Sequence, residues 1–152
     1  LPGLVERVLR DTGVPPASLE LELTEQEMSA QGPALLPVLA RLRELGVRVA
    51  VDDFGSGALP IRQLAGLPID AVKLHGSVIA GVASDAQAES LARSVLALAR
   101  ELGLQVIAEG VETADQARVL KAHGCDVAQG FHFSPPLSPE AVPAFVNRER
   151  GS

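Results

Sequence analysis

Carboxylate side chains recur in this sequence where short apolar runs end. The acids at these positions are Glu22, Asp52, Asp53 and Glu109. Four carboxylates at one place would repel one another, so some of them would have to bind protons. Hard divalent cations such as Mg²⁺, Mn²⁺ and Ca²⁺ remove this difficulty because they prefer oxygen ligands. Two such ions about 3.5–4 Å apart commonly hydrolyse phosphodiesters, and Asp52 is our candidate for a carboxylate that both ions share.

Three further polar residues belong to the same pattern. Lys73 lies within an apolar run, Glu112 lies in the turn after Glu109, and Gln129 ends the last short apolar run. In parallel α/β folds the chemistry takes place at the carboxyl ends of the strands. If these runs are parallel strands, the sequence predicts one site at that rim, to which every strand contributes.

The elements that would position these residues alternate between short β-rich runs and longer helical runs. Strands are expected over residues 19–23, 47–51, 71–74, 105–108 and 127–128. Helices are expected over residues 2–12, 33–45, 61–65, 114–122 and 139–147, and a long helix, capped by Ser84 in a capping box with Gln87, is expected to end at Leu102. This order predicts right-handed βαβ units and a parallel sheet. The predicted fold is α/β, an incomplete TIM-like (β/α) barrel with about five of the roughly eight strands of a closed barrel.

The adjacent acids Asp52 and Asp53 need a special backbone to serve one site. Neighbouring side chains on a strand point to opposite faces of the sheet. Both acids can face the site only if the strand stops there, and the glycines at 55 and 57 permit such a sharp turn. An alternative is that the pair merely caps a helix or forms a turn, where aspartate is favoured.

Composition limits the classes of partner and compartment. Acidic residues number 19 and basic residues 13, and no basic block is present, which argues against a polymeric nucleic acid as partner. The single cysteine, Cys125, excludes an internal disulfide and a multi-thiolate zinc site and suits a reducing compartment, so we expect a cytoplasmic location. No apolar stretch is long enough to span a bilayer.

Five motifs in order resemble the EAL domain, the bacterial metal-dependent phosphodiesterase that cleaves cyclic di-GMP. They are "LELELTE" (19–25), "VAVDDFGSG" (49–57), "DAVKL" (70–74), "VIAEGVET" (106–113) and "CDVAQGFHFSPPL" (125–137). The likeness extends from about Leu4 to Phe145. It implies cyclic di-GMP as the substrate and two ions, Mg²⁺ or Mn²⁺, as cofactors.

The resemblance also implies a ligand set for these ions. Glu22 resembles the ligand of one metal, and Asp52 resembles the acid shared by both. Asp53 and Glu109 resemble ligands of the second metal.

The same likeness suggests roles for three other residues. Lys73 resembles the lysine that orients or deprotonates the attacking water. Glu112 resembles the residue that organises the loop after Asp53, and Gln129 resembles a polar contact to metal-bound water or substrate.

The sequence departs from the family pattern in three respects. The strand with the name-giving Glu-Ala-Leu motif and the following strand with an asparagine ligand are absent, so we expect residues 1–152 to be a single, N-terminally truncated EAL-like domain. His75 stands where the family usually has aspartate. Ala58-Leu59-Pro60 stands in place of a Tyr-Ser-Ser-type segment that normally couples dimerisation to the active site.

These departures leave three hypotheses for function. The first is hydrolysis of cyclic di-GMP to linear pGpG by two-metal catalysis. The second is a degenerate module that binds the dinucleotide or a protein without catalysis. The third is a fragment that is inactive alone and that associates into a homodimer or a larger assembly through unpaired sheet edges.

Several residues keep a plainer interpretation beside the functional one. Glu20 shares a face with Glu22, so either could be a surface acid. Lys73 could be a solvated lysine at a sheet edge. Glu112 could simply precede a helix that Thr113 caps. His75 could be a metal ligand or a structural residue.

Overall fold

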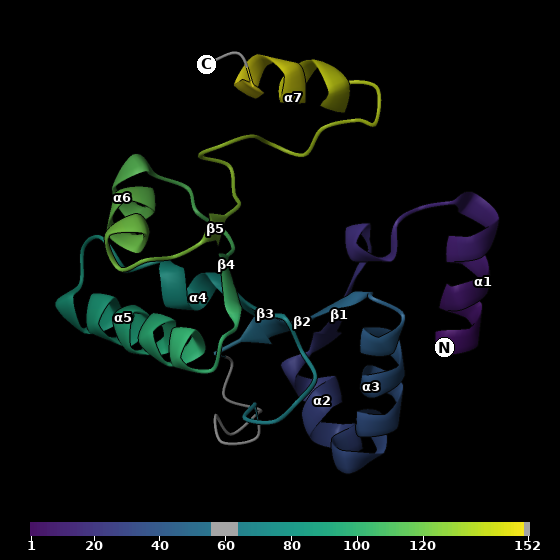
Figure 1. Cartoon of the computed structure of the whole chain (residues 1–152). Coiled ribbons are helices and arrows are strands. Elements are labelled where there is room, and N and C mark those ends of the chain that lie inside the picture. The colour runs from purple at the N-terminus through teal and green to yellow at the C-terminus, as the bar shows by residue number, and fades with distance from the viewer. Residues whose placement is uncertain (56–63, 151–152) are drawn as a thin grey trace.

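The computed structural model describes residues 1–55 and 64–150, and its centre is one sheet of five parallel strands. The strands are β1 (Glu20–Thr24), β2 (Arg48–Phe54), β3 (Ala71–Leu74), β4 (Gln105–Ala108) and β5 (Val127–Ala128). They lie side by side in chain order, and the sheet is open, with β1 and β5 at its two edges (Figure 1). The predicted α/β class and the five parallel strands are therefore confirmed.

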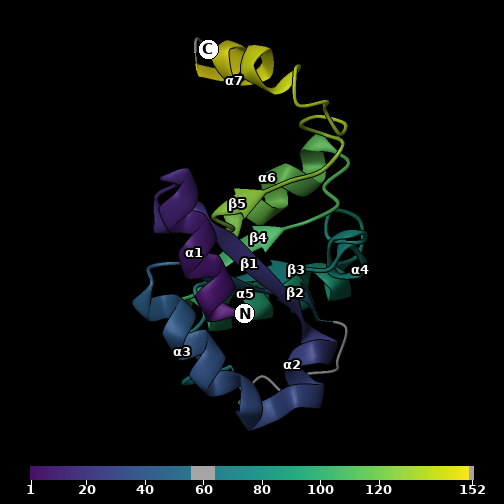
Figure 2. The ribbon, with the colours of Figure 1, turned by 90° about the vertical axis from the view of Figure 1, so that its right-hand side faces the viewer.

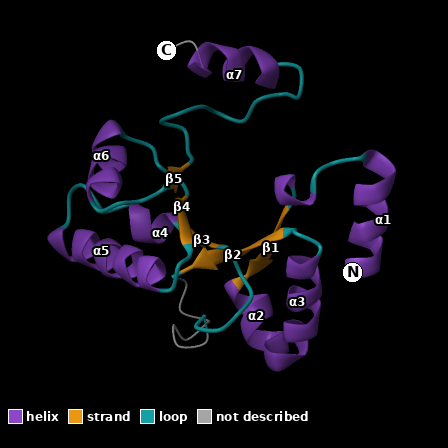
Figure 3. Cartoon of the chain, viewed as in Figure 1, coloured by secondary structure: helices purple, strands orange, loops and turns teal. Residues whose placement is uncertain are grey.

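The helices are α1 (Pro2–Thr12), α2 (Glu25–Gln31), α3 (Leu36–Glu44), α4 (Gly76–Ile79), α5 (Ala86–Glu101), α6 (Ala114–Ala122) and α7 (Val142–Arg150), with short 3₁₀ turns at Pro16–Ser18 and Gly32–Leu35. All the helices except α7 pack along one side of the curved sheet (Figure 3). Within the described part of the chain, none of these helices is long and apolar enough to cross a membrane.

The two faces of the sheet have different compositions because side chains alternate along each strand. The helix-covered face carries a large apolar core, to which the strands contribute Val49, Val51, Val72, Leu74 and Val106. The opposite face carries a small separate cluster of Ala50, Ala71 and Ile107. Polar residues lie on both sides of that small cluster along the strands, and those on one side form the candidate site.

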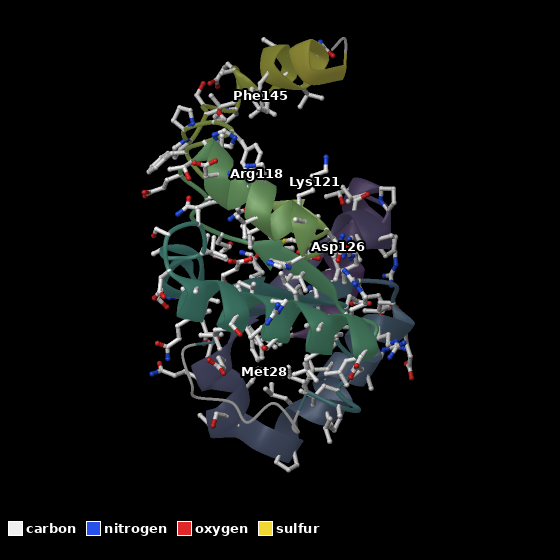
Figure 4. All side chains as sticks on the ribbon, turned by 90° about the vertical axis from the view of Figure 1, so that its left-hand side faces the viewer. Met28, Arg118, Lys121, Asp126 and Phe145 are labelled. Carbon is white, nitrogen blue, oxygen red and sulfur yellow. The ribbon has the colours of Figure 1, made fainter. Side chains whose placement is uncertain are left out.

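The C-terminal helix α7 lies apart from the sheet in two perpendicular views (Figures 1 and 2). Figure 4 shows Phe145 on this helix at the end of the molecule opposite the core residue Met28, whereas Arg118 and Lys121 project from α6. The helix begins at Val142 and ends at Arg150, three residues later than the predicted 139–147. Proline is favoured in the first turn of a helix, and in α7 that proline is Pro143.

Other helices also differ from the prediction. Residues 25–31 form α2, which was not expected, although Thr24 and Glu27 form a capping box that starts it. The long helix α5 begins at Ala86 because the Asp85 carboxylate, not Ser84, accepts the hydrogen bond from the Gln87 backbone. Helix 33–45 is divided into a 3₁₀ turn and α3. The helix expected over 61–65 lies mostly outside the described residues.

Strand β2 also differs from the prediction, because it does not stop at the paired acids. It continues to Phe54, which pairs with Leu74 of β3. The ladder between β2 and β3 is irregular between Val51 and Phe54, and Asp53 has a left-handed φ of 55°. The backbone therefore already changes direction at Asp53, inside the strand, and Gly55 two residues later also has a positive φ of 101°.

Candidate functional site

We call the face of the sheet opposite the helix-covered one the inner face. Because side chains alternate along each strand, four charged residues lie at the same end of this inner face. Glu22 and Asp52 come from β1 and β2, Lys73 comes from β3, and Glu109 directly follows β4. Thr24 pairs with Asp52 across β1 and β2, which fixes the register of these neighbouring strands. We call Glu22, Asp52, Lys73 and Glu109 the rim.

Lys73 is the centre of the rim. Its Nζ atom donates to Glu109 Oε1 at 2.7 Å and to Glu22 Oε1 at 2.8 Å, and it lies 3.8 Å from Asp52 Oδ1. The Lys73 side chain is 9% exposed, so it is no solvated edge lysine. One ammonium thus brings together carboxylates from three strands.

The electrostatic environment keeps Lys73 charged. Desolvation by burial alone would lower the pKa of its ammonium, but the hydrogen bonds to Glu109 and Glu22 and the nearby charges outweigh it. The pKa of Lys73 is therefore raised above its ordinary value.

Asp53 lies beside the rim. Its backbone N–H donates to Asp52 Oδ1 at 2.8 Å, and its own carboxylate turns toward His75, with 3.9 Å between Asp53 Oδ1 and His75 Nε2. Both side chains are about half exposed. The left-handed backbone of Asp53 allows the adjacent acids to lie at the same end of the sheet.

Gln129 directly follows β5 and contacts the rim, whereas Glu112 makes no such contact among the described residues. Gln129 Nε2 donates to Glu109 Oε1 at 2.6 Å, the same oxygen that Lys73 contacts. Glu112 instead lines a hollow of about 430 Å³ together with Gln129, Phe131 and Pro135. The loop that Glu112 was expected to organise lies largely in residues 56–63, outside the described part.

The plainer interpretation of Glu112 also holds in part. Thr113 caps α6 in a capping box with Gln116, and Gln116 Oε1 accepts from the backbone N–H of Glu112 at 2.8 Å. These bonds fix the backbone of Glu112 and leave its carboxylate exposed at the hollow.

The two acids of β1, Glu20 and Glu22, lie in different groups of polar residues. Glu20 pairs with Arg48 at 3.3 Å, and Arg48 donates in turn to Gln105, so these three residues form a polar layer at the opposite end of the inner face. The cluster of Ala50, Ala71 and Ile107 lies between this layer and the rim. Glu22, not Glu20, is therefore the β1 acid of the rim.

The EAL domain model matches residues 1–136 of this chain. The chain belongs to the EAL domain family. The cyclic di-GMP phosphodiesterase NbdA of Pseudomonas aeruginosa is 38% identical over 146 residues, which are 96% of this chain and 19% of that protein. This chain thus spans about a fifth of the length of that relative.

Solved structures of EAL proteins agree with this assignment. The EAL domain of Mycobacterium smegmatis DcpA superposes with a TM-score of 0.91 at 35% identity, over 97% of this chain and 66% of that one. Klebsiella pneumoniae BlrP1, in a complex with calcium and cyclic di-GMP, superposes with a TM-score of 0.83 at 30% identity, over 89% of this chain and 34% of that one. The TIM-like class of the fold is thereby confirmed.

The three carboxylates of the rim suit hard cations in type, because such cations prefer oxygen ligands. Among the described residues, however, no three side chains of His, Cys, Asp or Glu stand close enough together to hold a metal ion. Lys73 lies between Glu22 and Glu109 and forms an ion pair with each of them. In this arrangement the ammonium supplies one positive charge between these carboxylates.

Some residues at this end of the sheet were not anticipated from the sequence. Phe131 is 68% exposed and lines the hollow of Gln129 and Glu112. Thr24 and Gln26 line a second, smaller hollow with Asp53 and His75. Their only sequence signal is their position at the end of a strand or within a few residues after it, where side chains reach the carboxyl rim.

Proposed function

We propose that this EAL chain takes part in the hydrolysis of cyclic di-GMP to linear pGpG with divalent cations, in bacterial second-messenger signalling. The observation that carries the proposal is the convergence of Glu22, Asp52 and Glu109 on one cationic centre. The relative NbdA, a cyclic di-GMP phosphodiesterase, and the BlrP1 complexes with cyclic di-GMP and calcium or manganese support it.

Four carboxylates of this chain would hold the cations. Glu22 would contribute to one site, Asp53 and Glu109 to the other, and Asp52 to both. Divalent cations, when bound, polarise a phosphodiester and lower the pKa of water. Mg²⁺ and Mn²⁺ are the proposed ions because they prefer oxygen ligands.

Lys73 and Gln129 would orient the reacting groups. An ammonium has three N–H donors, and Lys73 uses two of them on Glu109 and Glu22. The third can hold the attacking water or a phosphate oxygen. Gln129 fixes the Glu109 carboxylate through its amide, so it acts on the chemistry by positioning a neighbour.

The larger hollow suits a nucleobase. Phe131 offers an exposed aromatic ring on which a base can stack. The Glu112 carboxylate is an acceptor at the same hollow and can take the N–H donors on the edge of guanine. One guanosine of the dinucleotide would lie here, next to Gln129.

Hydrolysis of cyclic di-GMP by the full-length protein, followed by chromatography of pGpG, tests the proposal. Turnover should require Mg²⁺ or Mn²⁺ and should disappear in Glu22→Gln. Lys73→Ala should lose about 10²–10³-fold in kcat, as removal of one preorganised donor does elsewhere. Glu20→Gln is the matched control, because Glu20 lies two residues away on the same face and pairs with Arg48. Equal losses in both glutamate variants would contradict the proposal.

A second candidate is binding of cyclic di-GMP, or of a protein partner, without catalysis. The tight pairing of Lys73 with Glu22 and Glu109 favours it, because the ammonium already occupies one oxygen of each of two carboxylates that metal ions would use. Calorimetry with cyclic di-GMP beside the hydrolysis assay separates the two. Binding without pGpG supports the binding module, and metal-dependent product supports the enzyme.

We also propose that the 152-residue chain by itself self-associates and is inactive. Strands β1 and β5 each pair with one neighbour in the described part of the chain, and open strand edges invite pairing with other chains. Light scattering should report a dimer or a larger assembly. A monomer with full metal-dependent turnover contradicts this prediction.

A further inference from the structure

His75 lies at a small hollow that borders the rim. The hollow has a volume of about 190 Å³ and is lined by Thr24, Gln26, Asp53 and His75. It adjoins the rim through Asp53, whose backbone donates to the Asp52 carboxylate. A group of phosphate size fits this volume, and all four lining side chains are polar.

Hydrogen bonds fix which ring nitrogen of His75 carries the hydrogen. The backbone N–H of Ser77 donates to His75 Nδ1 at 3.2 Å, and Ser77 Oγ lies 2.8 Å from the same nitrogen. A backbone N–H is only a donor, so Nδ1 must accept. In a neutral imidazole one nitrogen accepts and the other donates, so Nε2 carries the hydrogen.

This arrangement argues against His75 as a metal ligand. Ligation through Nε2 would move the ring hydrogen to Nδ1, where it would face the N–H of Ser77. The cost would be one hydrogen bond of the backbone and the cap of α4, which His75 provides. The imidazole therefore presents a donor to the hollow.

The Nε2–H of His75 has no acceptor at hydrogen-bonding distance among the described residues. The nearest carboxylate oxygen, Asp53 Oδ1, is 3.9 Å away, beyond the range of a direct bond. Thr24 is already engaged, because its hydroxyl donates to Glu27 Oε2 at 2.9 Å. The hollow thus combines an unused donor with space for an acceptor beside the rim.

We propose that His75 is a substrate-binding residue whose Nε2–H donates to a phosphate oxygen of the dinucleotide at this hollow. The inference rests on the proposed function, since it concerns the same site. It adds a specific contact through a residue at which this chain departs from the usual EAL pattern. The contact would hold the anionic oxygen beside Asp53, whereas Lys73 contacts the carboxylates of Glu22 and Glu109.

Two substitutions separate this contact from the structural role of His75. In His75→Asn the side-chain oxygen can still accept from Ser77 and cap α4, but the Nε2 donor is lost. In His75→Gln the amide N–H reaches about as far from the backbone as Nε2–H does. Cyclic di-GMP should bind about tenfold or more weakly to His75→Asn, as expected for a lost hydrogen bond to a charged group. His75→Gln should recover part of the affinity.

Calorimetry on the full-length protein with a divalent cation measures these affinities, and thermal unfolding measures stability. His123→Asn is the matched control, since His123 pairs with Glu89 at the end of α6 and does not line the hollow. A merely structural role predicts that His75→Asn binds as the wild type does, and this result would overturn the inference while leaving the proposed function intact. Absence of cyclic di-GMP binding by the wild type would overturn both.

Long-range ¹H–¹⁵N spectra of the imidazole rings give a readout without turnover. In the free protein the neutral ring of His75 should carry its hydrogen on Nε2, and this resonance should shift when cyclic di-GMP is added. A ring protonated at Nδ1 would overturn the inference, as would an Nε2 signal that does not respond to bound ligand.

Discussion

The rim and the segment after β5 both belong to the candidate site, yet they are built differently. The rim residues lie on or directly after regular strands, and Lys73 at their centre is buried. The segment from 129 to 141 is mostly irregular, and Phe131 and Phe133 are 68% and 49% exposed. Strand register therefore determines the geometry of the rim, whereas the segment is held by few packed side chains. Substitutions at the rim should change stability and function together, and substitutions in the segment should change function alone.

The sharpest contrast is expected between Leu74→Ala and Phe131→Ala. Leu74 follows Lys73 on β3 and has no exposed surface, so its truncation should lower the free energy of unfolding by about 2–5 kcal/mol. Phe131→Ala should change it by no more than about 0.5 kcal/mol but should weaken cyclic di-GMP binding. Urea denaturation and calorimetry measure the two effects. Similar losses of stability would show that the segment is as integral to the fold as β3, the strand that carries Lys73.

Lys73→Met should have the next largest effect. Removal of one partner from a buried ion pair costs about 3–5 kcal/mol, and we expect about 2 kcal/mol because Glu22 is 44% exposed. Mn²⁺ should restore part of the loss by neutralising the same carboxylates. Arg48→Met is the control, since it breaks the exposed pair with Glu20 at the opposite end and should cost less than about 1 kcal/mol. Equal costs, with no response to Mn²⁺, would contradict the central role of Lys73.

The pH dependence of the Lys73 contribution has a definite sign. Because the folded state raises the pKa of Lys73 above 10.5, its contribution is fully present below pH 10.5 and is lost only as the pH rises through the higher folded value. The difference in stability between wild type and Lys73→Met should therefore stay constant from neutral pH to about pH 10. If this difference in stability shrinks between pH 7 and 9, the stabilisation does not come from the charge of Lys73.

A smaller effect is expected where β1 passes into α2. Thr24→Ala removes the hydroxyl that caps α2 and should cost about 1 kcal/mol. Thr113→Ala removes the equivalent cap of α6 and should cost a similar amount, which makes it a suitable comparison. If Thr24→Ala also weakens nucleotide binding and Thr113→Ala does not, the small hollow of Thr24 is part of the site.

The smallest effect should come from Glu27 at acid pH. Hydrogen bonds from the backbone and the hydroxyl of Thr24 lower the pKa of Glu27 below 4.5. A lowered folded pKa means that the contribution is present above pH 4.5 and is lost as the pH falls through the folded value. Glu27→Gln should accordingly flatten the stability profile below pH 4.5. If stability depends on pH below 4.5 in Glu27→Gln as it does in the wild type, the charge of Glu27 in the capping box contributes nothing to stability.

Much of the rim could be predicted from the sequence because it follows from two regular features. Side chains alternate along strands, and parallel strands deliver their ends to one edge. These two facts place Glu22, Asp52, Lys73 and Glu109 together without knowledge of any loop. The sequence already favoured Glu22 over Glu20, although both have the same parity, and the contacts of Glu22 with Lys73 and of Glu20 with Arg48 agree with that choice.

Other features depend on local competition that the sequence pattern does not resolve. Ser84 and Asp85 are both good helix caps, and the preference of α5 for Asp85 is decided by one hydrogen bond to Gln87. The left-handed backbone of Asp53 is rare for a residue with a side chain, so a turn at the glycines was the simpler expectation. The tautomer of His75 depends on Ser77, and no spacing rule indicates that contact.

Asp52 is the residue whose replacement separates two-metal hydrolysis from every other interpretation of the rim, because it would bind both cations. Cyclic di-GMP hydrolysis should be measured for the full-length wild type, Asp52→Asn and the control Glu20→Gln, each over a Mn²⁺ titration. We expect Mn²⁺-dependent formation of pGpG by the wild type and Glu20→Gln, and none by Asp52→Asn at any concentration of the ion. Undiminished turnover by Asp52→Asn would show that the carboxylates of the rim do not hold catalytic cations.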